Sequence, residues 1–443
     1  MRIVIVGAGA VGSYLAERLS GEGQDVVVIE ADEDRAAQMQ ERLDALVITG
    51  NGSSPAVLLE AGVARADLLI AVSNSDGANA LACHAATRLG ARRTVARIED
   101  PGIREGLTDL GIDVVIDPGE TAARELVALV RQGGVSELVE FAGGKLLLVG
   151  ATVPPGSPMA GSRVAALREC KGDLDWVAAA VVRHGHTVVA HGDTSIRAGD
   201  HILIMVRSED LDRATDLLGV QRQRARRVII LGSTRLAELT AELMAKAGFE
   251  VTMVDSDSDR CRAITEHQRS VLAICGDPTD PAVLEELNVG IQDAVLALTG
   301  WDEVNILGCL VAKALGAGTT VSRFNRISYV SLLGGVGIDA TVSSRLLAAG
   351  AILRFVRRGR IHSVATFKDT DAEAIELEVD ARSPAVGQSL AGLGLPMGAV
   401  IGGILRRHQA FVPTGATIIE PHDRLIFFAL PEAIHRAEKV FSL

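Results

Sequence analysis

Residues 2–12 read RIVIVGAGAVG, and residues 25–30 read DVVVIE. An apolar strand, a glycine-rich turn, a helix and a second apolar strand ending in an acid form the fingerprint of a dinucleotide-binding βαβ unit. The unit returns later, where residues 227–237 read RVIILGSTRLA and residues 250–255 read EVTMVD. Gly7 and Gly232 have the same separation along the chain as Glu30 and Asp255. The chain therefore contains the same fold-determining unit twice.

The repeat extends well beyond the two glycine loops. Three polar positions recur at a common spacing, Asn79 as Asn305, Arg97 as Arg323 and Asp113 as Asp339. Short apolar stretches alternate with amphipathic helical stretches in both copies, which is typical of a doubly wound parallel α/β sheet. Short alternating strands follow each copy, as in residues 201–206 and 424–429. We therefore predict two Rossmann-like domains over residues 1–135 and 226–356, each followed by a small α+β domain, over residues 136–222 and 357–443.

The composition excludes several classes of protein. The 44 Lys and Arg residues are outnumbered by 56 acids, and the net charge of −12 argues against nucleic-acid binding and against a basic membrane anchor. No stretch reaches the roughly 18 apolar residues that a membrane span requires. Met1 runs directly into the first strand and leaves no room for a signal peptide. We expect a cytoplasmic protein without direct membrane insertion.

Neither the cysteines nor the histidines indicate a metal site. The chain has five cysteines, Cys83, Cys170, Cys261, Cys275 and Cys309. This odd number, without close pairing or zinc spacing, predicts reduced cysteines packed in the interior. The cluster of His184, His186, His191 and Asp193 has no ligand at any matching position of the second copy, so we expect no metal there. We find no arrangement typical of a catalytic triad, an acid pair or a cysteine nucleophile.

The first glycine loop meets each contextual requirement of its motif. Gly7 permits the tight turn, Gly9 lets the backbone approach a diphosphate, and Gly12 lets the helix pack on the strand. The helix start offers N–H groups to phosphates. Glu30 can accept hydrogen bonds from ribose hydroxyls, and its charge favours NAD(H) over NADP(H). The predicted binding residues of this loop are Gly7, Ala8, Gly9, Ala10, Val11, Gly12 and Glu30.

The second loop keeps only part of this pattern. Thr234 takes the place of the second glycine and brings a Cβ to where a diphosphate would approach. Gly232 and Asp255 are retained, and Arg235 could meet a terminal phosphate or lie over the surface. Two interpretations therefore remain open for the second copy, a nucleotide site or a structural repeat.

Three further polar residues follow strands of the first copy. Arg97 follows one apolar strand, and Ser73 and Asn74 follow another. Ligands of such sheets lie at the carboxyl ends of the strands, so these side chains are candidates for nucleotide contacts. Turn formation explains Ser73 and Asn74 equally well, and a solvated arginine explains Arg97 equally well.

At this point the sequence resembles a known family over essentially its whole length. Two glycine-loop domains, each followed by a strand-rich domain that ends in a Gly-Asp-type turn, look like the TrkA family, the regulatory subunits of Trk-type potassium-uptake systems. Residues 3–12, 50–53 and 71–76, Asn79 and residues 96–98 and 140–141 carry the resemblance. The resemblance implies tandem RCK domains (also called KTN domains), with RCK-N and RCK-C repeated twice.

The resemblance also implies a function. It predicts a homotetramer whose RCK domains form a ring on the inner face of the cell membrane, bound to a potassium channel subunit of the TrkH/TrkG type. NAD(H) and ATP/ADP would bind the first loop and bias the pore between open and closed states. The family pattern adds Asn51, Ser73, Asn74 and Arg97 to the predicted site, while the second loop lacks the family's usual glycine richness.

Three functional hypotheses follow. The first is a non-enzymatic, nucleotide-sensing gate, the second is an NAD-dependent dehydrogenase, and the third is an adaptor whose nucleotide is purely structural. Hydride transfer would require a proton donor near the nicotinamide. The small domains repeat Arg183 as Arg406 but repeat no His or Lys at corresponding places. This favours the gate.

Overall fold

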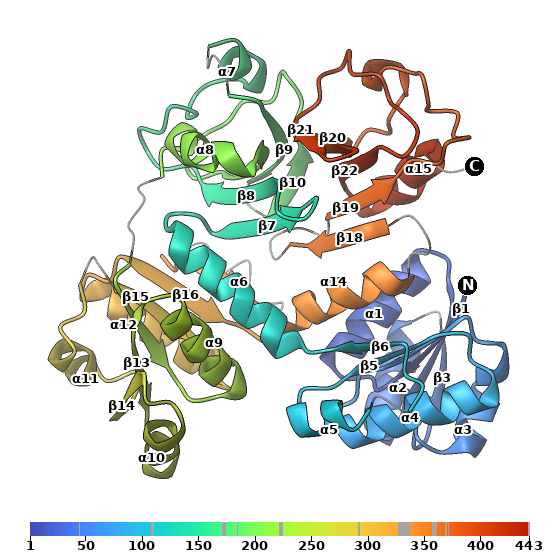
Figure 1. Ribbon diagram of the computed structural model, residues 1–443, viewed down its shortest axis with the longest axis vertical. Coiled ribbons are helices and arrows are strands. Elements are labelled where there is room, and N and C mark those ends of the chain that lie inside the picture. Colours follow the sequence, from blue (N-terminus) through green and yellow to red (C-terminus); the bar gives the residue numbers. More distant parts are fainter. Residues whose placement is uncertain are drawn as a thin grey trace. The chain divides into compact units, whose positions relative to one another are not determined.

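The computed structural model describes residues 1–43, 45–107, 110–170, 174–183, 185–220, 225–290, 293–326, 337–356, 361–367, 370 and 372–441 (Figure 1). The chain divides into two compact units. Unit 1 contains residues 1–121 and 344–358, and unit 2 contains residues 122–343 and 359–443.

Unit 1 is built on a parallel sheet of six strands in the order β3-β2-β1-β4-β5-β6. The strands are β1 (Arg2–Val6), β2 (Asp25–Glu30), β3 (Leu46–Thr49), β4 (Leu68–Ala71), β5 (Thr94–Arg97) and β6 (Val114–Ile116). The helices of this unit are α1 (Ala10–Gly21), α2 (Glu33–Arg42), α3 (Pro55–Glu60), α4 (Asp76–Leu89) and α5 (Pro101–Glu105), with a 3₁₀ turn at Val63–Arg65. Central strands are apolar throughout because helices cover a parallel sheet on both faces. The strand order reverses between β1 and β4, which is where such sheets bind ligands.

One helix of unit 1 comes from far along the chain. The helix α14 (Ser344–Val356) follows the second sheet in sequence, yet it packs against α1 and β6. The guanidinium of Arg93 donates to the carbonyl oxygen of Phe355 at 3.3 Å and lies 5.9 Å from the centre of its ring. The first Rossmann-like domain therefore includes a helix from the second half of the chain.

Unit 2 contains a second parallel sheet of the same topology, in the order β14-β13-β12-β15-β16-β17. The strands are β12 (Arg227–Leu231), β13 (Glu250–Asp255), β14 (Val271–Cys275), β15 (Asp293–Ala297), β16 (Thr319–Arg323) and β17 (Ala340–Val342). The helices are α9 (Arg235–Lys246), α10 (Ser258–His267), α11 (Pro281–Glu286) and α12 (Asp302–Ala314). The identical strand order confirms that the sequence repeat is a structural repeat.

Unit 2 also contains two antiparallel sheets of five strands, in the orders β10-β9-β11-β8-β7 and β18-β19-β22-β20-β21. The first has β7 (Glu137–Phe141), β8 (Leu146–Thr152), β9 (Trp176–Arg183), β10 (His186–Val189) and β11 (His201–Arg207), with α6 (Pro118–Gln132), α7 (Val164–Cys170) and α8 (Leu211–Leu218) beside it in sequence. The second has β18 (Ile361–Thr366), β19 (Glu373–Glu378), β20 (Ala399–Arg406), β21 (Gln409–Phe411) and β22 (Arg424–Ala429), followed by α15 (Pro431–Phe441). Two 3₁₀ turns, Ser208–Asp210 and Leu390–Gly392, complete the two small domains.

The two small domains share one hydrophobic core. Leu146 and Met205 of the first domain belong to the same buried cluster as Ile426 and Phe428 of the second. A repeated ion pair stabilises each domain. The guanidinium of Arg183 donates to both carboxylate oxygens of Asp200 at 2.7 Å.

The second domain has the same pair, because Arg406 donates to Asp423 at 2.9 and 2.8 Å. Hydrogen bonding to Asp423 raises the pKa of Arg406 above its ordinary value.

The predicted fold, two Rossmann-like domains each followed by a small α+β domain, is confirmed. Among the described residues, no helix has both the length and the apolarity to cross a membrane.

Candidate functional site

The first glycine loop connects β1 to α1 and lies at the carboxyl edge of the first sheet. Gly7 has a φ of +99°, and a Cβ there would meet backbone atoms of Ser73 at 2.9 Å. A Cβ at Gly12 would also clash, because it would lie 1.8 Å from the carbonyl oxygen of Gly7. These two glycines are therefore required by packing, whether or not a ligand binds.

Gly9 differs from both. It is the N-cap of α1, its backbone is extended (φ −66°, ψ −176°), and a Cβ there would have no atom of the described residues within 4 Å. Within the described chain no side chain caps α1, and its first turn carries no acid. A helix start without a side-chain cap leaves backbone N–H groups available to an anion, and the helix dipole favours negative charge there. The loop is thus open at the one glycine that the fold itself does not require.

Glu30 ends β2 and points back to this loop. Its carboxylate accepts hydrogen bonds from the backbone N–H of Ala8 at 2.5 Å and of Asp32 at 3.0 Å, and the residue is 8% exposed. These bonds hold the carboxylate at the edge of the sheet while leaving acceptor capacity on both oxygens. The acid therefore lies beside the first glycine loop, and its contact with a ribose stays a prediction.

The other predicted residues lie along the same edge. Ser73 follows β4, and both its backbone N–H and its hydroxyl donate to Asn79, at 2.9 and 2.7 Å. Arg97 ends β5, and its guanidinium donates to Glu99 at 2.9 Å. Asn74 is exposed, and Asn51 accepts hydrogen bonds from the N–H and hydroxyl of Ser53 in an exposed turn. The structure thus places Ser73 against Gly7 and engages Ser73, Arg97 and Asn51 with neighbours; their contact with a nucleotide stays a prediction.

The sequence marks Asn79 as a repeated residue and as part of the family resemblance, and the structure shows what it does. The side chain is fully buried in α4, and its amide donates to the carbonyl oxygens of Ser73 at 3.0 Å and of Arg97 at 2.9 Å. It thereby ties the ends of β4 and β5 together. Asn305 joins Thr299 and Arg323 in the same way in the second copy. Its recurrence in both copies is the signal that the sequence offers for this role.

The second loop is arranged differently around Thr234. The Thr234 hydroxyl donates to the carbonyl oxygen of Leu298 at 2.7 Å and accepts from the N–H of Ala237 at 3.3 Å. The threonine therefore caps α9 and bridges the loop to the end of β15. The first turn of α9 also carries Glu238, and burial raises the pKa of that carboxyl group. The Thr234 cap disfavours an anion at the start of this helix, because its hydroxyl already accepts a hydrogen bond from a backbone N–H there.

The remaining residues of the second loop form bonds within the protein. Asp255 accepts from the Ser233 hydroxyl at 2.7 Å and from the N–H of Asp257 at 2.9 Å. Gly232 has a φ of +100° and packs against Thr299, as Gly7 packs against Ser73. Arg235, the first residue of α9, is half-buried. The acid and first glycine of the fingerprint are present, but side chains of the protein itself occupy the surroundings of the helix start.

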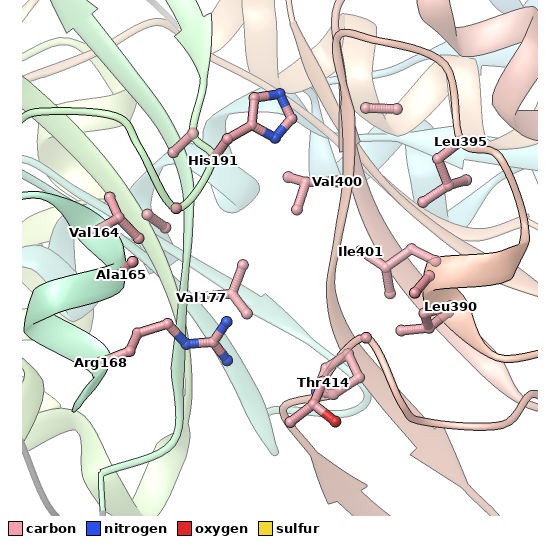
Figure 2. Close-up of a pocket in the computed structure, with 17 residues that line it drawn as sticks. Val164, Ala165, Arg168, Val177, His191, Leu390, Leu395, Val400, Ile401 and Thr414 are labelled. Carbon is pink, nitrogen blue, oxygen red and sulfur yellow. The ribbon is translucent and has the colours of Figure 1, made fainter.

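A separate cavity of about 340 Å³ lies between the two small domains (Figure 2). Its lining is mainly aliphatic and comes from both domains, with Ala165 and Val177 from the first and Ala391 and Val400 from the second. Figure 2 shows Arg168 extending from α7 toward this cavity and His191 at another edge of it. None of the described residues that line it is an acid.

The cysteines differ in part from what the sequence predicts. Cys275 is exposed, so the prediction that the cysteines are buried packing residues is wrong for this position. The sequence shows no close pairing of cysteines, but the structure places the Cys261 sulfur 3.5 Å from the carbonyl oxygen of Ile274, the residue before Cys275. The side chain of Cys170 and all of His184 lie outside the described residues.

Comparisons with known proteins agree with this architecture. The TrkA-N domain model matches residues 3–118 and 228–344, and the TrkA-C domain model matches residues 148–219 and 374–442. The chain is 36% identical over 447 residues to a Trk system potassium uptake protein TrkA homolog of Archaeoglobus fulgidus, covering 100% of both chains. It is 32% identical over 453 residues to the Trk system potassium uptake protein TrkA of Halomonas elongata, covering 100% of this chain and 99% of the relative.

Solved structures show the same fold. The GsuK RCK domain is 19% identical, with a TM-score of 0.61 covering 99% of this chain and 94% of that chain. A GsuK channel bound to NAD is 20% identical, with a TM-score of 0.61 covering 99% of this chain and 78% of that chain. Two TrkA-N matches, two TrkA-C matches and full-length relatives at these identities place this chain in the TrkA family.

Proposed function

We propose that this chain is the nucleotide-sensing regulatory subunit of a Trk-type potassium-uptake system. It binds NAD(H) and ATP/ADP in its first Rossmann-like domain and controls a membrane potassium channel subunit of the TrkH/TrkG type. It acts in the cytoplasm, on the inner face of the cell membrane, and reaches the membrane through that partner. The family membership supports the role in potassium uptake, and the geometry of the first glycine loop supports the nucleotide.

The observation that carries the proposal is the open start of α1. Gly9 leaves free space where a diphosphate would approach, and in the described chain α1 has neither a side-chain cap nor an acid in its first turn. In the second copy Thr234 caps α9, and Glu238 lies in its first turn. One chain therefore presents one loop suited to a diphosphate, and we expect one dinucleotide per chain.

A repeated exposed surface supports a homotetramer. Leu81 of α4 and Leu307 of α12 are 58% and 50% exposed, and they occupy equivalent positions of the repeat. Leu46 of β3 and Leu272 of β14 form a second exposed pair with the same spacing. Both Rossmann-like domains thus expose the same apolar positions, which suits one type of contact used repeatedly in a ring. We propose that four chains supply eight such domains.

Calorimetric titration of the full chain with NADH and with NADPH tests the nucleotide site. NADH is expected to bind with one site per chain, and NADPH to bind weakly because Glu30 repels its 2′-phosphate. Replacing Glu30→Ala is expected to weaken NADH binding by about 1.5–3 kcal/mol, the typical contribution of hydrogen bonds to a charged group. Equal affinity of the parent protein for both cofactors would contradict the role of Glu30.

We propose a regulator and not an oxidoreductase. Apart from Glu30, which is held by the backbone N–H groups of Ala8 and Asp32, the predicted polar residues along the carboxyl edge of the first sheet are serine, asparagine and an arginine that pairs with Glu99. Steady consumption of NADH with any member of a metabolite panel, followed by absorbance, would overturn this part of the proposal.

A further inference from the structure

The second Rossmann-like domain holds two neighbouring thiols at the carboxyl edge of its sheet. Cys275 is the last residue of β14, and Cys261 lies on α10, the helix that packs on β13 and β14. The Cys261 Sγ lies 3.4 Å from the carbonyl oxygen of Asp255 and 3.5 Å from that of Ile274. Asp255 pairs with Cys275 across the two strands, and Ile274 directly precedes it. The Cys261 thiol therefore lies at the end of β14, beside the backbone that leads into Cys275.

This pair is a property of the second copy alone. Thr49 matches Cys275, because it pairs with Glu30 as Cys275 pairs with Asp255. Ala36 matches Cys261, because each is the fourth residue of its helix. The first copy therefore has no thiol at either position.

The other two cysteines whose side chains the structure describes differ from this pair. Cys83 and Cys309 occupy equivalent positions of the repeat, on α4 and α12. Both are fully buried, and burial raises the pKa of each thiol to about 12. Cys83 and Cys309 are thus repeated packing residues, whereas a common packing role does not explain Cys261 and Cys275.

The two neighbouring thiols differ in their access to solvent. Cys275 is exposed, and its Sγ lies 3.9 Å from the carbonyl oxygen of Ser256. Cys261 is 7% exposed. Burial, followed by the neighbouring Cys275, raises the pKa of the Cys261 thiol. A small oxidant can therefore reach Cys275 first, while Cys261 stays protonated behind it.

We propose that Cys261 and Cys275 form a dithiol that peroxide converts reversibly to a disulfide. The thiolate of Cys275 attacks one oxygen of hydrogen peroxide, the O–O bond breaks, and the released hydroxide takes up a proton to give water. The sulfur of Cys261, losing its proton, then attacks the resulting sulfenic acid of Cys275. The S–S bond forms as the S–O bond breaks, and a second water leaves. Two thiols lose two electrons in all, and one peroxide becomes two waters.

The bridge would act on the part of the domain that corresponds to the nucleotide edge of the first copy. It would link α10 to the end of β14. The turn at Ser256 and Asp257 leads into α10, and the Asp257 N–H in this turn holds the Asp255 carboxylate. The second copy would thus respond to oxidant where the first is proposed to respond to nucleotide. The inference does not depend on nucleotide binding.

Mass spectrometry of the full chain tests the inference. The protein, carrying Cys170→Ser, is treated with hydrogen peroxide, its free thiols are alkylated, and it is digested after acidic residues. Cleavage at Asp277 separates Cys275 from Cys309, and cleavage at Asp259 and Glu266 isolates Cys261. We expect a linked pair of peptides containing Cys261 and Cys275, lighter by two hydrogen atoms than the sum of the two thiol peptides. Dithiothreitol should restore both thiols.

Variants separate the two steps. Cys261→Ser should stop the reaction at a sulfenic acid on Cys275 that dimedone traps, and Cys275→Ser should give neither product. Cys309→Ser is the matched control and should leave the disulfide unchanged. The proposal is overturned if peroxide leaves both thiols alkylatable, or if it carries Cys275 to the sulfinic acid while Cys261 stays reduced.

Discussion

At the scale of single residues, the three glycines of the first loop do not all lack a side chain for the same physical reason. Gly7 and Gly12 are demanded by close contacts within the protein, with Ser73 and with the Gly7 carbonyl oxygen respectively. Gly9 borders open space in the described chain and has a backbone conformation that any residue adopts. Only at Gly9 does the absence of a side chain point to something other than the fold, which is why it marks the proposed diphosphate position.

This difference predicts opposite behaviour for two alanine substitutions. Gly9→Ala should change the free energy of unfolding by no more than about 0.5 kcal/mol, since its Cβ meets nothing among the described residues. It should still weaken NADH binding, because the Cβ fills space that the diphosphate needs. Gly12→Ala should destabilise the domain by about 1–3 kcal/mol, the usual cost of overpacking. Urea unfolding and calorimetry of both variants check this, and an unchanged NADH affinity in Gly9→Ala would contradict the assignment.

At the scale of elements, a buried asparagine connects the ends of neighbouring strands in each sheet. Asn79 accepts from the backbone N–H and hydroxyl of Ser73 and donates to the carbonyl oxygens of Ser73 and Arg97. Asn305 serves Thr299 and Arg323 in the same manner. The two asparagines are structurally equivalent, but only Asn79 adjoins the loop that is proposed to bind nucleotide. Asn305 is therefore an internal control for the effect of Asn79 on nucleotide binding.

Replacing either asparagine by alanine should cost about 3 kcal/mol of stability, because buried backbone groups lose their partners. Asn79→Ala should in addition weaken NADH binding, since Ser73 packs against Gly7 and loses its support. Asn305→Ala should leave NADH affinity unchanged. The comparison is made by urea unfolding and calorimetry, and a loss of NADH affinity in Asn305→Ala alone would be inconsistent with a single site in the first copy.

Much of the fold at this scale follows from sequence pattern. Two parallel sheets are predicted by the repeated spacing of Gly7 and Gly232 and by the strands, which are apolar throughout. Strands of this composition are typical of parallel sheets, because helices cover both faces of such sheets. The position of α14 could not be predicted, since an apolar helix face does not say which sheet it covers. The Thr234 cap depends on a carbonyl oxygen at the end of β15, and the Cys261–Cys275 pair depends on the register of β13 and β14. Such contacts join residues whose proximity only the tertiary fold creates.

At the scale of the whole molecule, the repeat itself indicates assembly. Leu81 and Leu307 are exposed at equivalent positions, whereas exposed Leu59 corresponds to Glu285 in the second copy. A contact used by both domains should involve the first pair and not Leu59. The double variant Leu81→Glu, Leu307→Glu is therefore expected to dissociate the tetramer, and Leu59→Glu to leave it intact. Light scattering at micromolar concentration gives the mass, and a parent protein that is strictly monomeric would defeat the prediction.

Gating places a thermodynamic condition on the assembled protein. A ligand shifts a conformational equilibrium only by its different affinity for the two states. If ATP and ADP bias a potassium pore in opposite directions, they must contact the first loop or its surroundings differently. The third phosphate of ATP is the chemical difference between them, and an arginine is the natural partner for it. Arg97, which ends β5 at the carboxyl edge of the same sheet as the first loop, is our candidate.

The most direct test is potassium flux through the chain reconstituted with its membrane channel subunit, measured with ATP and with ADP. We predict that the two nucleotides change the flux in opposite directions and that Gly9→Val, which fills the proposed diphosphate position, abolishes both responses. Thr234→Val changes the equivalent position of the second copy and should preserve both. Flux that is indifferent to nucleotides, or that still responds in Gly9→Val, would contradict the account.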